Sequence, residues 1–205
     1  ALPVTVATYT QSSSRYDRLR FNFYYDAASA ISVRLKDPAG NVSAWMTPSA
    51  TPYEGTMGDG SGYYLQVGNA AESYNSNIKR IFVLVGELDS ETDGKYVRSG
   101  SWELQFKADS GSTRLDGWLY DAAGGDIDAT FTSPDPDMTL GNDACGKNVI
   151  AVAAYVSRYS WAASDGKTYH YTSQTQDAIA TFSSIGPTRD FRQKPDVTGG
   201  GTNIL

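Results

Sequence analysis

The fold is indicated first by the stretch Leu19-Arg20-Phe21-Asn22-Phe23, in which apolar and polar side chains alternate. Alternation with a period of two is typical of a β-strand buried on one face, because successive side chains point to opposite sides of a strand. The same alternation recurs at Ile31/Val33/Leu35, Tyr63/Leu65/Val67, Trp102/Leu104/Phe106 and Leu115/Gly117/Leu119. These repeats predict a mainly β domain with Phe21, Phe23, Ile31, Val33, Trp102, Leu104 and Phe106 in its interior.

The segments around these strands support the same prediction. Residues Ile81–Val85 are continuously apolar, which predicts a strand covered on both faces. Turn-forming residues lie between the apolar segments at 37–41, 58–60, 93–94 and 124–125, and no convincing helix intervenes. Short strands with polar turns predict an antiparallel β-sandwich, with a jelly roll as the expected version. Most of the 14 tyrosines and 4 tryptophans fall at positions suited to its core.

A proline-rich connector divides the chain. Pro134 and Pro136 disfavour a helix and remove backbone donors, so we expect an irregular segment at 132–142. We therefore predict a jelly-roll-like β-sandwich domain over 1–137 and a second region over 138–205. The regions also differ in charge: 11 Lys/Arg against 18 Asp/Glu give −7 in the first, and 6 against 5 give +1 in the second.

Composition limits the classes of function. A hydrophobic fraction of 40% with 20% charged residues fits a soluble globular protein, and no apolar run approaches the roughly 18 residues that span a bilayer. The first residues lack the basic flank and apolar core of a signal peptide. The net charge of −6, without a Lys/Arg cluster, argues against nucleic-acid binding. Cys145 is the only cysteine, so we expect a small buried residue and no internal disulfide.

The second region contains three motifs in a distinctive order. Lys147-Asn-Val-Ile-Ala-Val-Ala-Ala154 comes first, and its Asn148–Ala154 part predicts a buried strand. Residues 155–171 predict a hairpin with its turn at 164–167. Ala180-Thr-Phe-Ser-Ser-Ile-Gly-Pro187 follows, and then Lys194-Pro-Asp-Val197. In this order the motifs resemble the run that leads toward the serine nucleophile in subtilisin-like serine peptidases, over residues 139–205.

This resemblance implies a fold and a domain arrangement. The strand at 149–154 would belong to a central parallel sheet, with a tight turn at Gly186-Pro187 and a stiff segment at Pro195. The implied fold class is mainly β: an antiparallel, jelly-roll-like β-sandwich plus a partial subtilisin-like α/β segment. The sandwich resembles modules that some family members carry as an insert between the catalytic histidine and serine. The chain departs from the family at Gly199-Gly200-Gly201, where Ala-Pro-Gly is usual and where we expect a more mobile link.

The resemblance also bears on individual residues. The family's Gly-Thr-Ser nucleophile motif does not occur in the sequence, and we predict no catalytic residue in it. His170, the only histidine, is expected to face outward from the hairpin, and Asn142 to lie in a turn rather than supply an oxyanion donor. Phe182 corresponds to a position near the subsites on the leaving-group side, with a buried aromatic as the preferred explanation. Asp196 is expected to accept hydrogen bonds from nearby backbone donors.

The predicted function follows from these assignments. No metal site or cofactor is predicted, although a structural Ca²⁺ at Asp126/Asp128 or Asp135/Asp137 is considered, with a solvated turn as the preferred explanation. We interpret the chain as a segment of a secreted or cell-surface bacterial subtilisin-like serine endopeptidase, inactive by itself. Its partners would be a peptide or protein substrate and the remainder of the catalytic domain. The alternative is a non-catalytic β-sandwich module that binds carbohydrate or protein.

Overall fold

A computed structural model describes residues 1–90, 93–121 and 127–202. The chain divides into two compact units, Ala1–Pro134 and Asp135–Leu205, and the division falls a few residues before the boundary at 137/138 that the prolines suggest. The described residues form strands, turns and one short 3₁₀-helix, without an α-helix. The mainly β class predicted from the alternating residues is confirmed. None of the helical structure described is long enough to cross a membrane.

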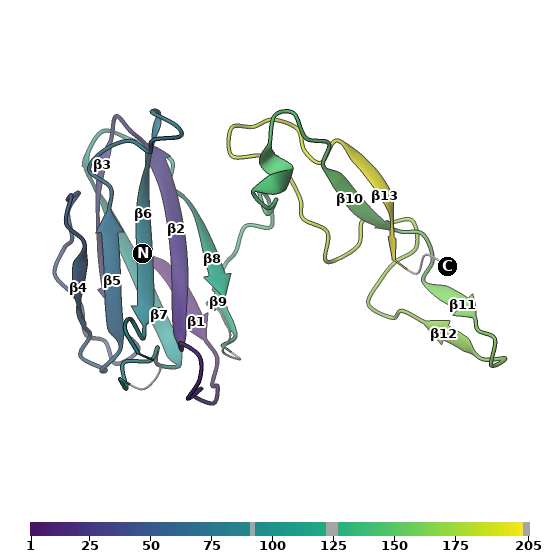
Figure 1. The fold of residues 1–205 in the computed structure, drawn as a ribbon, viewed down its shortest axis with the longest axis horizontal. Coiled ribbons are helices and arrows are strands. Elements are labelled where there is room, and N and C mark those ends of the chain that lie inside the picture. Colours follow the sequence, from purple (N-terminus) through teal and green to yellow (C-terminus); the bar gives the residue numbers. More distant parts are fainter. Residues whose placement is uncertain (91–92, 122–126, 203–205) are drawn as a thin grey trace. The chain divides into compact units, whose positions relative to one another are not determined.

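The first unit is built from two antiparallel sheets. Its strands are β1 (Leu2–Val6), β2 (Arg18–Asp26), β3 (Ala30–Lys36), β4 (Tyr53–Thr56), β5 (Gly62–Val67), β6 (Ile78–Gly86), β7 (Gly100–Ser110), β8 (Asp116–Asp121) and β9 (Ala129–Phe131). One sheet has the order β4-β5-β6-β2-β8 and the other β3-β7-β1-β9 (Figure 1). The pairing is nested: β1 pairs with β9, β2 with β8, β3 with β7 and β5 with β6.

The interior of this unit is filled by the alternating residues that the sequence identifies. Leu19, Phe21 and Phe23 of β2 are buried, as are Ile31, Val33, Trp102 and Leu104 from the other sheet. The rings of Phe21 and Phe23 lie 6.2 Å apart, and Phe106, partly buried, meets Phe23 edge to face at 4.9 Å. Each fully buried side chain of this size stabilises the fold by about 1.5–3 kcal/mol. The predicted core is therefore confirmed.

Strand β6 matches its prediction only in part. Ile81, Val83 and Val85 are buried in the core between the sheets. Leu84 is 8% exposed on the opposite face, and Phe82 is partly exposed there. The outer face of β6 is therefore apolar without being fully covered, which explains why the sequence of this strand does not alternate.

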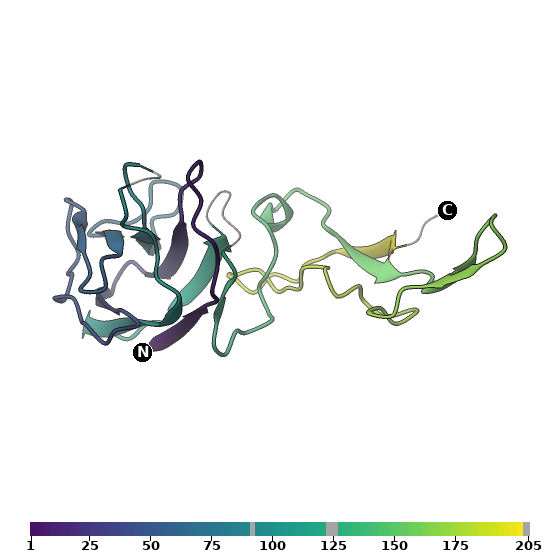
Figure 2. The same ribbon diagram turned by 90° about the horizontal axis from the view of Figure 1, so that it is seen from below.

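The second unit has little regular structure. It contains the 3₁₀-helix η1 (Asp143–Cys145) and the strands β10 (Val152–Val156), β11 (Ser160–Ala162), β12 (Thr168–His170) and β13 (Val197–Thr202). β10 pairs in parallel with β13, and β11 pairs with β12 in the predicted hairpin (Figures 1 and 2). The hairpin prediction is confirmed, and its turn is closed by a hydrogen bond from Ala163 N to Lys167 O of 2.8 Å.

Two predictions for this unit are wrong. The strand begins at Val152 rather than Asn148, and only the small residues Ala151 and Ala153 of the predicted buried segment are buried. Ile150 is 76% exposed, because no second layer of described residues covers it. Cys145 is partly exposed rather than buried.

Candidate functional site

The loop that carries Phe182 is fixed to strand β10. The backbone nitrogen of Ala180 donates to Ala154 O (2.9 Å), and Ala154 N donates to the Ser183 hydroxyl (3.0 Å). Ser183 N also donates to Ala180 O (2.8 Å), which closes a tight turn around Phe182. The turn is thus bonded to the strand on both sides of the aromatic ring.

The side chain of Phe182 is largely exposed to solvent. It is 63% exposed, so the preferred explanation of a buried aromatic is wrong. It lines an open pocket of about 280 Å³ together with Leu140, Ala144, Ala151, Val152 and Pro195. A large apolar ring held outward by a bonded turn is suited to contact with another molecule or another part of a protein.

An ion pair just before β13 is hydrogen-bonded to the backbone just before β10. Asp196 Oδ2 accepts from Ala151 N (2.7 Å) and from Lys194 Nζ (2.5 Å). The Lys194 ammonium also donates to Val149 O (2.5 Å), and this lysine is only 8% exposed. The ammonium group, together with the Ala151 amide, lowers the pKa of Asp196 below its ordinary value. The predicted role of Asp196 as an acceptor for backbone donors is confirmed.

The glycine run after Asp196 forms part of a strand. Ala154 pairs with Gly199 and Tyr155 with Gly200 in the β10/β13 ladder. A side chain on Gly201 would collide with Ala154, so glycine allows the two strands to approach closely. Residues 197–202 are therefore paired strand residues.

The segment before β13 contains a compact turn at 188–192. Asp190 accepts from Thr188 Oγ1 (2.6 Å) and from Arg192 Nε (2.9 Å). The Arg192 guanidinium, with the Thr188 hydroxyl, lowers the pKa of Asp190 to about 2. Arg192 also donates to Cys145 O (2.8 Å), which attaches this turn to η1. The turn is closed by a hydrogen bond from Phe191 N to Thr188 O. It therefore lies just after Gly186-Pro187, where the sequence predicts a turn.

The residues considered for catalysis and metal binding do not converge. His170 is exposed at the end of β12, with its ring 6.4 Å from that of Tyr159, and Asn142 is exposed at the start of η1. Asp135 Oδ1 accepts from Asp137 N (3.0 Å), as in a solvated turn. Asp126 lies outside the described residues. Among the residues that are described, no three His, Cys, Asp or Glu side chains gather as metal ligands.

Several other apolar side chains of the second unit are exposed besides Phe182. Ile179, Ile185 and Phe191 are also more than two-fifths exposed, and Val152 and Val197 are 62% and 52% exposed at paired positions of the ladder. Their exposure has no signal in the local sequence, because the same residue types fill the core of the first unit. The unit therefore exposes apolar side chains on its parallel strand pair and on adjoining loops.

Comparison with known proteins identifies the family. Residues 39–204 match the model of the subtilase family of peptidases. The chain belongs to the subtilase family. Its structure is similar to that of the CspB protease of Clostridium perfringens, with a TM-score of 0.71 and 18% sequence identity. The match covers 100% of this chain and 36% of that protease chain. Among curated proteins, no match was found.

The family assignment confirms the resemblance found in the sequence motifs. As a member of this family, the chain is related to serine peptidases, which hydrolyse peptide bonds. The match begins before β4 in the first unit and extends into β13 in the second. The family match therefore includes the larger part of the first unit, from residue 39 on, and nearly all of the second unit.

Proposed function

We propose that this chain is a segment of a secreted or cell-surface bacterial subtilisin-like serine endopeptidase. In this proposal residues 1–137 form an inserted, jelly-roll-like sandwich and residues 138–205 form part of the catalytic domain. Family membership supports peptide hydrolysis as the reaction class. The observation that supports a partial catalytic domain is the exposed apolar surface on the β10/β13 pair.

The parallel pair is the strongest support for this proposal. Parallel sheets are normally covered on both faces by other elements. Val152 and Val197 are partners in the β10/β13 ladder and both are more than half exposed. Ile150 precedes β10 and is more exposed still. The remainder of the catalytic domain would cover these side chains and complete the sheet.

We also infer which functions this segment and the remainder of the catalytic domain would each have. A subtilisin-like peptidase needs a serine nucleophile, a histidine base and an orienting aspartate to form its acyl-enzyme. The only histidine of this chain, His170, lies exposed on a hairpin. The segment therefore supplies positioning and substrate contacts, while the three catalytic groups belong to the remainder of the domain, and the segment is inactive by itself.

Phe182 is the residue proposed to contact substrate. Its ring is exposed, and the hydrogen bonds from Ala180 N and to Ser183 Oγ hold its turn against β10. We assign it to the leaving-group side of the scissile bond, where an apolar ring would pack against a substrate side chain. Such a contact would be made only by substrates that extend past the scissile bond on that side.

The test compares substrates in the peptidase that contains this segment. Phe182→Ala should lower kcat/KM by about tenfold for peptides extended on the leaving-group side, because an apolar contact of this size is lost. Substrates that end in a small chromogenic leaving group should be affected little. Phe191→Ala is the matched control, since Phe191 is also an exposed aromatic of the second unit. An equal loss for both substrate types would contradict the assignment of Phe182.

The alternative of a non-catalytic module is less well supported as an account of the whole chain. The family match runs from residue 39 in the first unit to residue 204 in the second, which favours one peptidase segment over a sandwich with an unrelated tail. Binding by the sandwich is still compatible with a role inside a peptidase.

A further inference from the structure

The outer face of the five-stranded sheet carries an unusual number of aromatic rings. Strand register places Tyr64, Leu84, Arg20 and Tyr120 in one row across the sheet, and Gln66, Phe82, Asn22 and Trp118 in the next. These side chains lie on the face opposite the core, because side chains alternate along each strand. Tyr24 joins them, with its ring 6.0 Å from that of Trp118. The expectation that most aromatic residues fill the core is therefore wrong for this sheet.

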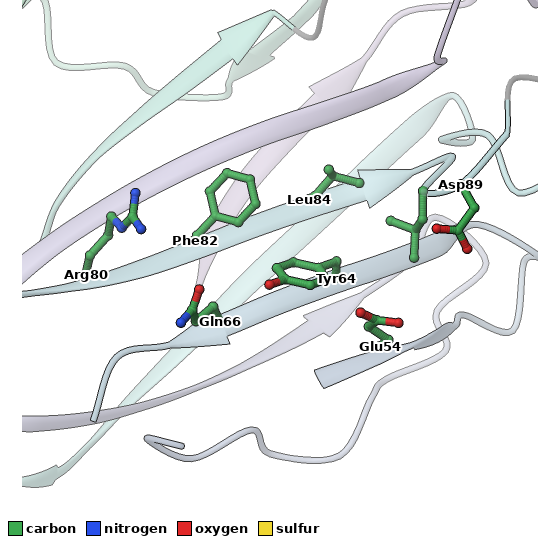
Figure 3. A pocket seen from close by; sticks show the side chains of 8 residues that line it. Glu54, Tyr64, Gln66, Arg80, Phe82, Leu84 and Asp89 are labelled. Carbon is green, nitrogen blue, oxygen red and sulfur yellow. The ribbon is translucent and has the colours of Figure 1, made fainter. Parts of the chain in front are cut away.

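A pocket of about 460 Å³ opens on this face above β4, β5 and β6. Tyr64 and Phe82 lie in its middle with ring centres 6.0 Å apart, next to Leu84 (Figure 3). Polar side chains lie at its two ends: Gln66 and Arg80 at one, Glu54 and Asp89 at the other (Figure 3). The pocket thus combines an apolar and aromatic centre with hydrogen-bonding groups of both kinds, donors and acceptors.

The polar groups of this pocket are unusual in having few partners. The side chains of Glu54, Gln66 and Asp89 make no hydrogen bond or ion pair with the described residues, and Arg80 has a 3.4 Å contact with Glu72. On the outer face of the other sheet the polar groups are paired with one another. The pairs are Arg34 with Gln105 (2.8 Å), Lys36 with Glu103 (2.7 Å) and Lys107 with Asp109 (3.0 Å).

We propose that the pocket around Tyr64 binds a neutral oligosaccharide. An aromatic ring at the centre can pack against the apolar C–H face of a sugar, while the amide and carboxylates at the ends bond its hydroxyls. The volume of the pocket lies within the range of small-molecule sites. A sugar has both an apolar C–H face for the aromatic centre and hydroxyl groups for the polar ends. The proposal concerns the sandwich alone and goes beyond the peptidase function proposed above.

The alternatives fit the pocket less well. A wholly apolar partner surface would leave Glu54, Gln66 and Asp89 without hydrogen bonds, which is costly for buried polar groups. A basic peptide would pair with the two carboxylates but would place its charge near Arg80 at the other end. A neutral ligand with many hydroxyls satisfies both ends without either penalty.

The experiment measures glycan binding by the full chain. Soluble β-1,3-glucan, xylan, mannan and chitin oligosaccharides are used in affinity electrophoresis and calorimetry, and at least one should bind. Gln66→Ala and Tyr64→Ala should each weaken that binding by about tenfold, whereas Gln105→Ala on the opposite sheet should leave it unchanged. Because the ligand is neutral, the affinity should be the same in low salt and in roughly 0.5 M salt.

Three results would overturn the proposal. The first is that none of these glycans binds. The second is that Gln66→Ala, which leaves the core intact, binds as tightly as the unchanged chain. The third is that oligolysine binds in place of the glycans and is released by salt, which would identify a basic peptide as the ligand. If Tyr64→Ala fails to fold, Gln66→Ala and Glu54→Gln decide the matter.

Discussion

At the scale of single residues, the same side chain has opposite roles in the two units. Phe21 and Phe23 are buried between two sheets, whereas Phe182 is exposed on a turn fixed by hydrogen bonds. What separates them is the presence or absence of a second layer, and not any property of the residue. Burial of Phe21 and Phe23 therefore stabilises the fold of this chain. Phe182 would contribute a similar free energy only when another surface covers its ring.

Trp102 provides a direct measure of the sandwich core. It is 3% exposed, and its indole nitrogen donates to Arg98 O (2.9 Å). Trp102→Ala should lower the free energy of unfolding by about 3–5 kcal/mol, because it leaves a large cavity. Trp45→Ala is the control: Trp45 is partly exposed beneath Arg34, and its loss should cost about 1 kcal/mol or less. Chemical denaturation measures both, and equal losses would contradict the core assignment.

Asp196 should make the second unit sensitive to acid. Lys194 and the Ala151 amide lower its pKa in the folded chain, while the unfolded value is about 3.9. Its stabilising effect is therefore complete above about pH 4 and is lost as the pH falls through the lower folded value. An NMR titration of the Asp196 carboxyl should give a midpoint below that of a model peptide. Lys194→Met should raise this midpoint, and a midpoint at the peptide value in the unchanged chain would contradict the contact.

At the scale of elements, the two units differ in how completely their strands are covered. Strand β6 has a neighbour on each side and a buried inner face. Strand β10 has β13 as its ladder partner and exposes Val152. Opening free energies are largest for strands surrounded by buried contacts and smallest for exposed ones. The second unit is therefore expected to be the less stable part of the chain.

Hydrogen exchange by residue tests this difference. Amides at 149–154 should exchange faster than those at 81–85, because the first segment lies largely outside a covered sheet. The measurement needs a chain shown to be monomeric, since association would protect the apolar surface. Equal protection in a monomer would mean that the second unit completes its own core, and would contradict the partial-domain proposal.

The sequence predicted elements better than their surroundings, and the physical reason differs between the units. Alternation at Leu19, Phe21 and Phe23 reports a buried face directly, because one sheet face is apolar and the other polar. Ile150 and Val152 lie in an apolar segment, and the apolar residues predict that this segment is buried. The elements that would bury it are not among the described residues. The pocket at Tyr64 was also missed, since strand register across β5 and β6 is not visible in either strand alone.

At the scale of the whole molecule, activity is expected only in a larger assembly. The isolated chain should hydrolyse no peptide or ester above background, and a fluorophosphonate probe for reactive serines should not label it. His170→Ala should change neither result, because His170 is exposed on a hairpin and we predict no catalytic residue in this chain. Turnover that survives removal of contaminating proteases and disappears in His170→Ala would show that this histidine is a catalytic base.

The nested pairing of the first unit has a consequence for how a host protein can carry it. Val4 of β1 lies opposite Phe131 of β9, so the first and last strands of the sandwich are neighbours. Paired residues of antiparallel strands have Cα atoms about 4.5–5.5 Å apart, so the chain enters and leaves the unit at adjacent points. A host fold needs to open only one surface loop to accept such a unit, and its own elements keep their places. Evolution can therefore add or remove the sandwich as one piece.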